Sequence, residues 1–472
     1  MTAELRVIAV AIALALAGVA QAAERSQDEA DKRALPCHIV PASGLALKTG
    51  QHSAAADLAE LPRPAKGESY RDPDYGVCVV RVTDHEHEPP TGFARNYYSR
   101  FQPFNADESL LLVFARNGEW HLYDAATFRH VKTLPLGGGS VEPQWHPRDP
   151  HKLYVLPDKG GMQIDLVDIR DGKRTTVVDF TELEGIAGHR GARSLKDVWP
   201  EAARVWTRWE GSPSMDARYW AFLVETKDGD PLGMITLDLE ERVILGTYDT
   251  QEIGRPDHIS MSPLGNFAVA SWTEKAARCP LFRKRGSFDR PCGVMAFTRD
   301  FREAVGLAAK SPHSDLAVDA DGREVIVVSN YDSGNVEMIE LATGKVTPLW
   351  RIYIDGASTA MHISGKAWRR PGWVLISTYW MNDPKEARPW YRDKLMAVEL
   401  REDPRIINIA SIASHVRSYF SEPHATVNRD FTRIVFNANW LTGRDDDVDV
   451  YMALLPPSAL RDDTYSADLL RR

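Results

Sequence analysis

Short apolar runs separated by polar turns recur along most of the chain. Each recurrence contains a strand-like run, a turn rich in Pro, Asp, Gly or Asn, and a second, strongly apolar strand. Seven such turns can be read, at residues 105–108, 146–149, 212–216, 262–265, 319–322, 369–372 and 428–430. Short strands at this spacing, with few long helical patterns, are typical of radially repeated four-stranded sheets. The sequence therefore predicts an all-β fold, a seven-bladed β-propeller.

Every turn is followed by the apolar strand that this fold requires, at Leu110–Phe114, Leu153–Leu156, Tyr219–Val224, Ala268–Ser271, Glu324–Ser329, Trp373–Thr378 and Ile434–Phe436. The last unit has only three obvious strands and ends at Val450–Leu454, whereas Val79–Thr83 is a lone strand near the N-terminus. Pairing these two strands would complete the seventh sheet and leave no exposed edge. We therefore expect a propeller closed by an N-terminal strand.

The remaining segments divide the chain around this propeller. The propeller is expected to span residues 78–460. An extension rich in Ala, Pro and charge precedes it at residues 23–77, and a short tail follows at 461–472. Residues 181–203 are predicted to form a short helical insertion between the second and third blades.

The N-terminus has the pattern of a cleaved export signal. A basic Arg6 precedes the apolar run Val7–Val19, and residues 20–22 form a small-x-small cleavage site. Residues 1–22 are therefore predicted to be a signal peptide, and the mature protein to be periplasmic or secreted. No later stretch approaches the roughly 18 apolar residues of a membrane helix, so no membrane span is expected.

Charge and cysteine content narrow the class of protein further. A formal net charge of -9 argues against nucleic acid as a partner. Four cysteines suit an oxidising compartment. Cys279 and Cys292 bracket a short excursion and are expected to form a disulfide, which leaves Cys37 with Cys78 as the other pair. Without any Cys-x-x-Cys spacing, a thiolate zinc site is not expected.

Histidines gather where the innermost strands of four consecutive blades are expected to begin. These residues are His258, His313, His362 and His424. Side chains at these positions converge around the central funnel, so three of the four could bind a divalent metal together with an Asp, Glu or Gln. The same histidines could instead act as acids and bases without a metal, or could simply hydrogen-bond neighbouring blades.

Arginines and tyrosines at equivalent positions suggest chemistry on an acidic sugar. Arg100 and Arg208 are expected to face the funnel opposite the histidines. Elimination at a uronate requires a neutralised carboxylate, a base for the proton α to it, and an acid for the leaving oxygen. His258, His313, Tyr331 and Tyr379 are candidates for these proton transfers.

Aromatic and amide side chains are predicted in the loops between second and third strands, on the same face of the propeller. The expected substrate rim consists of Trp272, Trp380, Asn382, Asn439 and Trp440. Flat apolar faces beside amides are the composition of a sugar-binding surface.

Two short segments resemble the seven-bladed polysaccharide lyases of the oligogalacturonate lyase type. They are EPQWHPRDP at residues 142–150 and EPHATV at residues 422–427. The resemblance implies a divalent metal, such as manganese, zinc or calcium, held by histidines and a glutamine, with a histidine base and no organic cofactor. That family places a glutamine and two histidines close together on one segment, and no segment here matches, so the metal would be assembled from residues of several blades.

The leading hypothesis is therefore a lyase that acts on a uronate-containing oligosaccharide or polysaccharide. The principal alternative is a non-catalytic propeller that binds a glycan or a protein with the same rim. Hydrolysis is a third possibility, because it needs two carboxylates about 5 to 10 Å apart. Such a pair could come from Glu142, Glu210, Asp257, Asp315 and Glu422.

Overall fold

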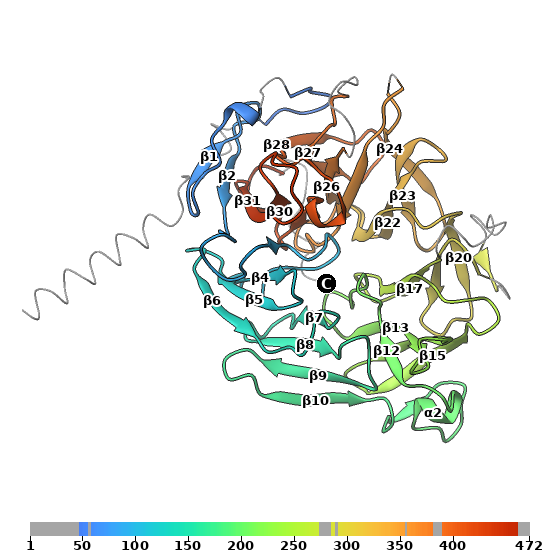
Figure 1. Cartoon of the computed structure of the whole chain (residues 1–472). Helices are drawn as coiled ribbons and strands as arrows, with labels where there is room; N and C mark the ends of the chain where they lie inside the picture. Colours follow the sequence, from blue (N-terminus) through green and yellow to red (C-terminus); the bar gives the residue numbers. More distant parts are fainter. Residues whose placement is uncertain are drawn as a thin grey trace, which may run out of the picture.

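Seven antiparallel sheets form a ring around a central axis (Figure 1). The computed structural model describes residues 47–54, 58–272, 285–287, 291–354, 356–380 and 389–460. The sheets follow one another in chain order, and in blades one, two, four, five and six the first strand is innermost. The predicted seven-bladed β-propeller is confirmed.

The first three blades lie between residues 94 and 249. Blade one contains β3 (Ala94–Arg95), β4 (Leu110–Ala115), β5 (Trp120–Asp124) and β6 (His130–Leu134). Blade two contains β7 (Glu142–Trp145), β8 (Lys152–Leu156), β9 (Gln163–Asp168) and β10 (Arg174–Asp179). Blade three contains β12 (Arg204–Trp206), β13 (Tyr219–Glu225), β14 (Pro231–Asp238) and β15 (Val243–Asp249), with β11 (Gly185–Ile186) parallel to β15 at its outer edge.

Blades four to six lie between residues 258 and 411. Blade four contains β16 (His258–Met261), β17 (Phe267–Ser271), β19 (Val294–Thr298) and β20 (Ala304–Ala308), with β18 (Arg285–Gly286) outside β20. Blade five contains β21 (Ser314–Val318), β22 (Glu324–Asn330), β23 (Asn335–Glu340) and β24 (Val346–Arg351). Blade six contains β25 (Ala360–Ser364), β26 (Trp373–Tyr379), β27 (Lys394–Glu399) and β28 (Ile406–Ser411).

Blade seven takes strands from both ends of the described chain. Its inner strands are β29 (Thr426–Val427), β30 (Arg433–Ala438) and β31 (Asp449–Leu454). Outside them lie β2 (Cys78–Arg81), which pairs with β31, and β1 (Ser69–Arg71), at the edge of the ring (Figure 1). The short helix η1 (Leu58–Glu60) precedes them. The described part of the extension also contacts blade six, because the backbone N–H of Asn408 donates to the carbonyl oxygen of Lys48.

The core is divided into layers between neighbouring blades. Every residue of β26 is buried, and successive side chains point to opposite faces of the strand. Leu375 packs in the cluster shared with blade seven, whereas Val374 and Ile376 pack in the cluster shared with blade five. A second strand such as β26 is therefore apolar at successive positions, because both of its faces are covered by neighbouring blades.

Among the described residues, helices are few and short. The predicted insertion contains one four-residue helix, α2 (Leu195–Val198), with Ser194 as its N-cap. The short helix η2 (Tyr419–Ser421) lies before the inner strand of blade seven. In the part of the chain that the structure describes, no helix is long and apolar enough to cross a membrane.

The inner strands of blades one and three differ from expectation. β3 ends at Arg95 and β12 ends at Trp206, so Arg100 and Arg208 follow these strands rather than beginning them. Arg208 and Trp209 have φ of 61° and 70°, in the left-handed region that turns a chain sharply. A break of this kind leaves no apolar periodicity, so the pattern of the sequence did not reveal it.

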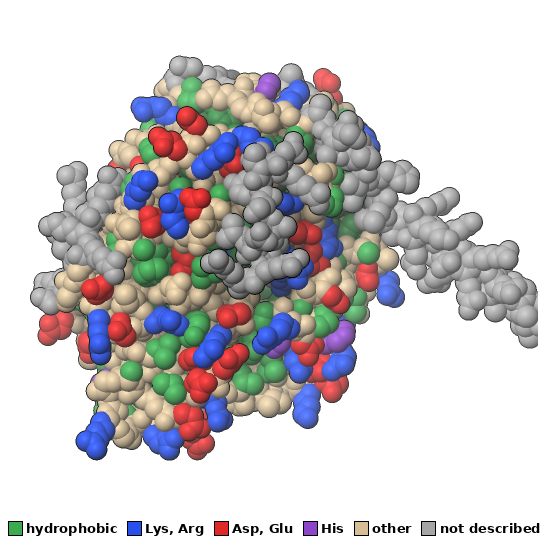
Figure 2. All heavy atoms as spheres, turned by 180° about the vertical axis from the view of Figure 1, so that it is seen from behind, with side chains coloured by type: hydrophobic (Ala, Val, Ile, Leu, Met, Phe, Trp, Pro, Cys, Tyr) green, Lys and Arg blue, Asp and Glu red, His purple; other side chains and the backbone are tan. Residues whose placement is uncertain are grey.

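Several expectations fall outside the described residues. They concern the signal peptide at 1–22, the C-terminal tail at 461–472, Cys37, Cys279 and Asn382. Each predicted disulfide therefore has one described cysteine, Cys78 or Cys292, and both pairings stay predictions. On the face drawn in Figure 2, acidic and basic side chains are interspersed over the described surface.

Candidate functional site

Three of the four predicted histidines contact one another at the central axis. The ring centroids of His313 and His362 are 4.8 Å apart, and those of His362 and His424 are 4.3 Å apart. They come from the beginnings of the inner strands of blades five, six and seven, which converge there. His362 and His424 are fully buried, while His313 is partly exposed.

Glu422 joins this group and orients it. Its Oε2 atom lies 2.8 Å from Nε2 of His362 and 3.7 Å from Nε2 of His424. Burial is the largest single influence on Glu422 and would raise its pKa, but the hydrogen bond and charge of His362, with His313 and the Tyr379 hydroxyl, together outweigh burial and lower the pKa. The side chain therefore carries a negative charge at neutral pH.

The hydrogen bonds fix which nitrogen of each ring carries the proton. His362 donates from Nε2 to the Glu422 carboxylate, and His424 donates from Nε2 to the carbonyl oxygen of Tyr419 at 2.9 Å. Burial, together with the neighbouring His362, lowers the pKa of His424 well below its ordinary value, so its ring is neutral. The lone pair of the neutral His424 ring is then on Nδ1, and in His362 the nitrogen that faces an acceptor is likewise Nε2.

Both Nδ1 atoms are buried without a hydrogen-bond partner. One atom from each of His362, Glu422 and His424 can be chosen so that all lie within 4.8 Å of one another. Metal-binding histidines in proteins usually donate their second nitrogen to a carboxylate or a backbone carbonyl, as both of these do. The donor set and the two unsatisfied nitrogens fit a divalent cation.

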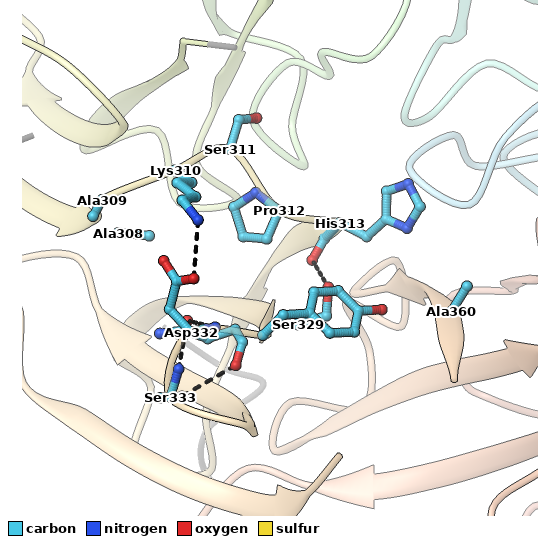
Figure 3. Close-up of a pocket in the computed structure, with 12 residues that line it drawn as sticks. Ala308, Ala309, Lys310, Ser311, Pro312, His313, Ser329, Asp332, Ser333 and Ala360 are labelled. Carbon is cyan, nitrogen blue, oxygen red and sulfur yellow. Dashed lines mark hydrogen bonds and ion pairs between the residues drawn. The ribbon is translucent and has the colours of Figure 1, made fainter. Parts of the chain in front are cut away.

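His313 connects this group to an open pocket of about 520 Å³. Figure 3 shows His313 on one side of the pocket, with Lys310 turned toward Asp332 on the other. The Nζ atom of Lys310 lies 2.9 Å from Oδ1 of Asp332. Burial and the neighbouring His362 lower the pKa of His313 to about 4, so its ring is neutral and can accept a proton. Tyr331 also lines the pocket, and its hydroxyl donates to the carbonyl oxygen of Thr359.

His258 belongs to a second group of side chains, and its hydrogen-bond partners are not the other histidines. Arg100 reaches from blade one to donate to Nε2 of His258, and it also pairs with Glu210 at 2.9 Å. Nδ1 of His258 faces Asp257 at 3.3 Å. Nε2 of His258 thus accepts a hydrogen bond from the cationic Arg100, which disfavours a metal ion at the same nitrogen. The four predicted metal ligands are therefore divided, with only His313, His362 and His424 in mutual contact.

Arg208 lies apart from the histidines. It donates to the carbonyl oxygen of Asp257 at 3.0 Å and lies 3.8 Å from the buried Glu225. With Arg255 it lines a separate pocket between blades three and four. Of the two predicted arginines, only Arg100 reaches a predicted histidine.

Tyrosines enclose the buried histidines. The ring of Tyr379 stacks on His362 at 5.2 Å, and its hydroxyl hydrogen-bonds with Glu422. Burial and the charge of Glu422 raise the pKa of Tyr379, so the phenol stays protonated. Tyr98 packs against both His362 and His424, at 5.3 and 5.1 Å.

The predicted rim residues are mostly used for packing. Trp272 is buried, and its indole N–H donates to the carbonyl oxygen of Gly254. Asn439 is also buried, and it binds backbone groups of His415 and Arg444. Trp440 stacks on Tyr451 at 5.6 Å, and Trp380 is half-buried under Arg392.

Two residues near the axis were not singled out from the sequence. Tyr98 lies two positions before Arg100, in the window where funnel residues were sought. Lys366 is fully buried and lies 3.2 Å from Asp315. Counting in steps of two along the inner strand from His362 leads through Ser364 to Lys366. Strand periodicity could therefore have placed Lys366 on the same face as His362.

No protein-family model matches the sequence, and no curated protein matches it. The fold is similar to an oligogalacturonate lyase in complex with manganese, with 14% identity, a TM-score of 0.52 and coverage of 84% of this chain and 97% of that chain. It is also similar to an oligogalacturonate lyase from Vibrio parahaemolyticus, with 12% identity, a TM-score of 0.53 and coverage of 83% and 97%. At these identities the likeness concerns the fold: the chain is a seven-bladed β-propeller similar in architecture to oligogalacturonate lyases.

Proposed function

We propose that this chain is a divalent-metal-dependent lyase that cleaves uronate-containing oligosaccharides by β-elimination. One observation carries the proposal: Nδ1 of His362 and Nδ1 of His424 are buried and without hydrogen-bond partners, beside the ionised Glu422. Such a set is costly to keep empty in a folded protein and is well suited to a cation. The fold likeness to a lyase in complex with manganese supports the same reading.

Each group near the axis has a role in this reaction. A bound divalent cation would neutralise the uronate carboxylate and so acidify the proton α to it. His313, whose neutral ring borders the pocket, accepts that proton. The C–O bond β to the carboxylate then breaks, a C=C bond forms, and the leaving oxygen takes a proton from water. Tyr379 keeps Glu422 in place through its hydroxyl.

The pocket beside His313 is suited to an acidic sugar. It contains a cation, Lys310, that is paired with Asp332 at the surface, and an aromatic face, Tyr331, that is 37% exposed. Aromatic faces beside polar groups bind the apolar surface of sugar rings. Arg100 is already bound to Glu210 and His258, so in this proposal it positions those groups rather than the substrate.

The cellular setting proposed here rests on the sequence. Residues 1–22 have the pattern of a signal peptide, and we propose that the protein is exported. A periplasmic or secreted location is consistent with the two disulfides proposed for the four cysteines.

An ultraviolet assay with oligogalacturonates tests the activity directly, because elimination produces an unsaturated product that absorbs and hydrolysis does not. We expect absorbance to rise with the manganese-loaded protein and to stop on chelation. His424→Ala should abolish the signal, whereas His87→Ala, in an exposed loop, should retain it. New reducing ends without absorbance would indicate a hydrolase. Binding without any turnover would indicate the non-catalytic alternative.

A further inference from the structure

Arg95 is a buried cation without a counter-ion. The residue is 3% exposed, and its Nε and Nη1 atoms have no hydrogen-bond partner. Among the described residues no carboxylate lies within salt-bridge distance of Arg95, whereas the buried Arg81 and Arg100 each pair with one. A buried guanidinium with unused N–H groups is unfavourable unless something else binds it.

Aromatic rings surround the guanidinium of Arg95. The centroids of Tyr419, Phe114 and Phe420 lie 4.9, 5.5 and 5.7 Å from its central carbon, and Phe93 and Tyr97 each lie at 5.8 Å. Cation–π contacts of this kind hold the charge in place. The hydroxyl of Tyr419 hydrogen-bonds with the guanidinium, but the Nε and Nη1 donors have no acceptor and remain available to an anion.

This arginine lies next to the histidine group. The ring of Tyr419 is 4.6 Å from that of His424, and the charge of Arg95 contributes to the low pKa of His424. Tyr419 and Phe420, both in η2, cover Arg95 and are 46% and 36% exposed. Rotation of one of these rings would therefore open the guanidinium to solvent.

A second arginine lies over the same aromatic cover. The guanidinium of Arg116, an exposed residue of the loop between β4 and β5, lies 5.0 Å from the ring of Phe420. Both cations thus lie against the ring of Phe420, at the boundary between blades one and seven. This combination suits a sugar that carries a carboxylate.

We propose that Arg95 and Arg116 form a subsite for the carboxylate of a second uronate residue, whose ring stacks on Tyr419 or Phe420. This inference rests on the proposed function, because it assumes that an acidic oligosaccharide reaches the histidine group. Each unsatisfied donor of Arg95 can make a charge-assisted hydrogen bond to a carboxylate oxygen. The subsite would make the protein prefer oligomers to a single uronate.

Calorimetric binding of trigalacturonate tests the subsite separately from turnover. The titration is done on the full mature protein with chelator present, with galacturonate and galactotriose as one-residue and uncharged probes. We expect Arg95→Met to weaken trigalacturonate binding about tenfold or more, because hydrogen bonds to charged groups are strong when buried. Arg116→Gln should weaken binding less, because Arg116 is exposed to solvent. Galacturonate binding should be unchanged, and Arg302→Gln, which removes a remote exposed arginine, should have no effect.

Thermal melting of the same variants shows whether packing is intact. Arg95→Met should melt no lower than the wild type, since it removes an unpaired buried charge and keeps the side-chain volume. Arg116 is exposed, so its variant tests the subsite without any cost in packing.

The outcomes separate this inference from the proposed activity. Unchanged trigalacturonate affinity in both Arg95→Met and Arg116→Gln would overturn the subsite, whether or not the protein is active. Equal affinity of the wild type for galactotriose and trigalacturonate, or no binding of trigalacturonate at all, would also overturn it. Arginine-dependent binding without an unsaturated product would support the subsite and contradict the lyase.

Discussion

Nε2 of His362 lies 2.8 Å from Oε2 of Glu422, and both side chains are buried where the blades converge. This hydrogen bond orients the His362 ring, and no hydrogen-bond partner contacts its Nδ1 atom. A histidine held in this way is a stronger metal ligand than a free one. Most of the chemistry proposed for this propeller depends on that one hydrogen bond.

Removing the charge of Glu422 should weaken metal binding. Glu422→Gln keeps the shape of the side chain but loses the negative charge that holds His362 and His424. We expect manganese affinity to fall about 10- to 100-fold, measured by titration of the chelated protein. Glu402→Gln, at an exposed turn, should bind as the wild type does. Unchanged affinity in Glu422→Gln would remove this carboxylate from the site.

Tyr379→Phe should separate catalysis from metal binding. The variant loses the hydroxyl that hydrogen-bonds with Glu422 but keeps the ring that stacks on His362. We expect kcat to fall roughly tenfold or more, since hydrogen bonds to charged groups contribute about 1.5–3 kcal/mol, while metal content stays the same. Tyr353→Phe, at an exposed ring, serves as the control. A full loss of metal would instead show that Tyr379 is needed to hold the metal-binding residues in place.

Asp449 should be a major contributor to stability. Its carboxylate is fully buried and pairs with Arg63 at 2.5 Å and Arg81 at 2.7 Å, which ties the N-terminal extension to blade seven. Asp449→Asn removes the buried charge that both arginines share and leaves Arg63 with Asp447 and Arg81 with Asp84, and we expect a loss of about 3 kcal/mol in urea unfolding. Asp446→Asn, which loses only an exposed pair, should cost less than about 1 kcal/mol. Similar losses in both variants would contradict this assignment.

His121 should make stability fall at mildly acidic pH. It is buried in blade one, with His130, Glu119 and Thr133 facing its ring. Burial and the neighbouring His130 lower its pKa to about 4 in the folded state. The unfolded chain binds the proton near pH 6.5, so stability is lost as pH falls from about 6.5 to 4, by about 3 kcal/mol at most.

Urea unfolding at several pH values in this range would reveal the contribution of His121. His121→Gln should flatten the pH dependence, whereas His87→Gln, at a side chain that is 75% exposed, should leave it unchanged. An identical pH dependence in wild type and His121→Gln would show that His121 does not bind the proton differentially.

The ring of blades follows from the sequence because each blade repeats the same order of apolar strand and polar turn. The site was harder to predict because it depends on contacts between blades. Arg100 crosses from blade one to His258 and divides the four histidines, and sequence spacing contains no trace of this contact. Trp440 was expected at the rim but stacks on Tyr451 under the N-terminal extension. That extension has little strand pattern of its own, so its position was not predictable.

Metal content is the most direct test of the central claim, which is that His362 and His424, held in place by Glu422, bind a divalent cation. The purified mature protein is incubated with manganese, dialysed and examined by elemental analysis, beside His424→Ala and the exposed control His87→Ala. We expect about one equivalent in the wild type and in His87→Ala, and close to none in His424→Ala or after chelation. A wild-type protein that retains no manganese, zinc or calcium, or a His424→Ala variant that retains a full equivalent, would contradict it.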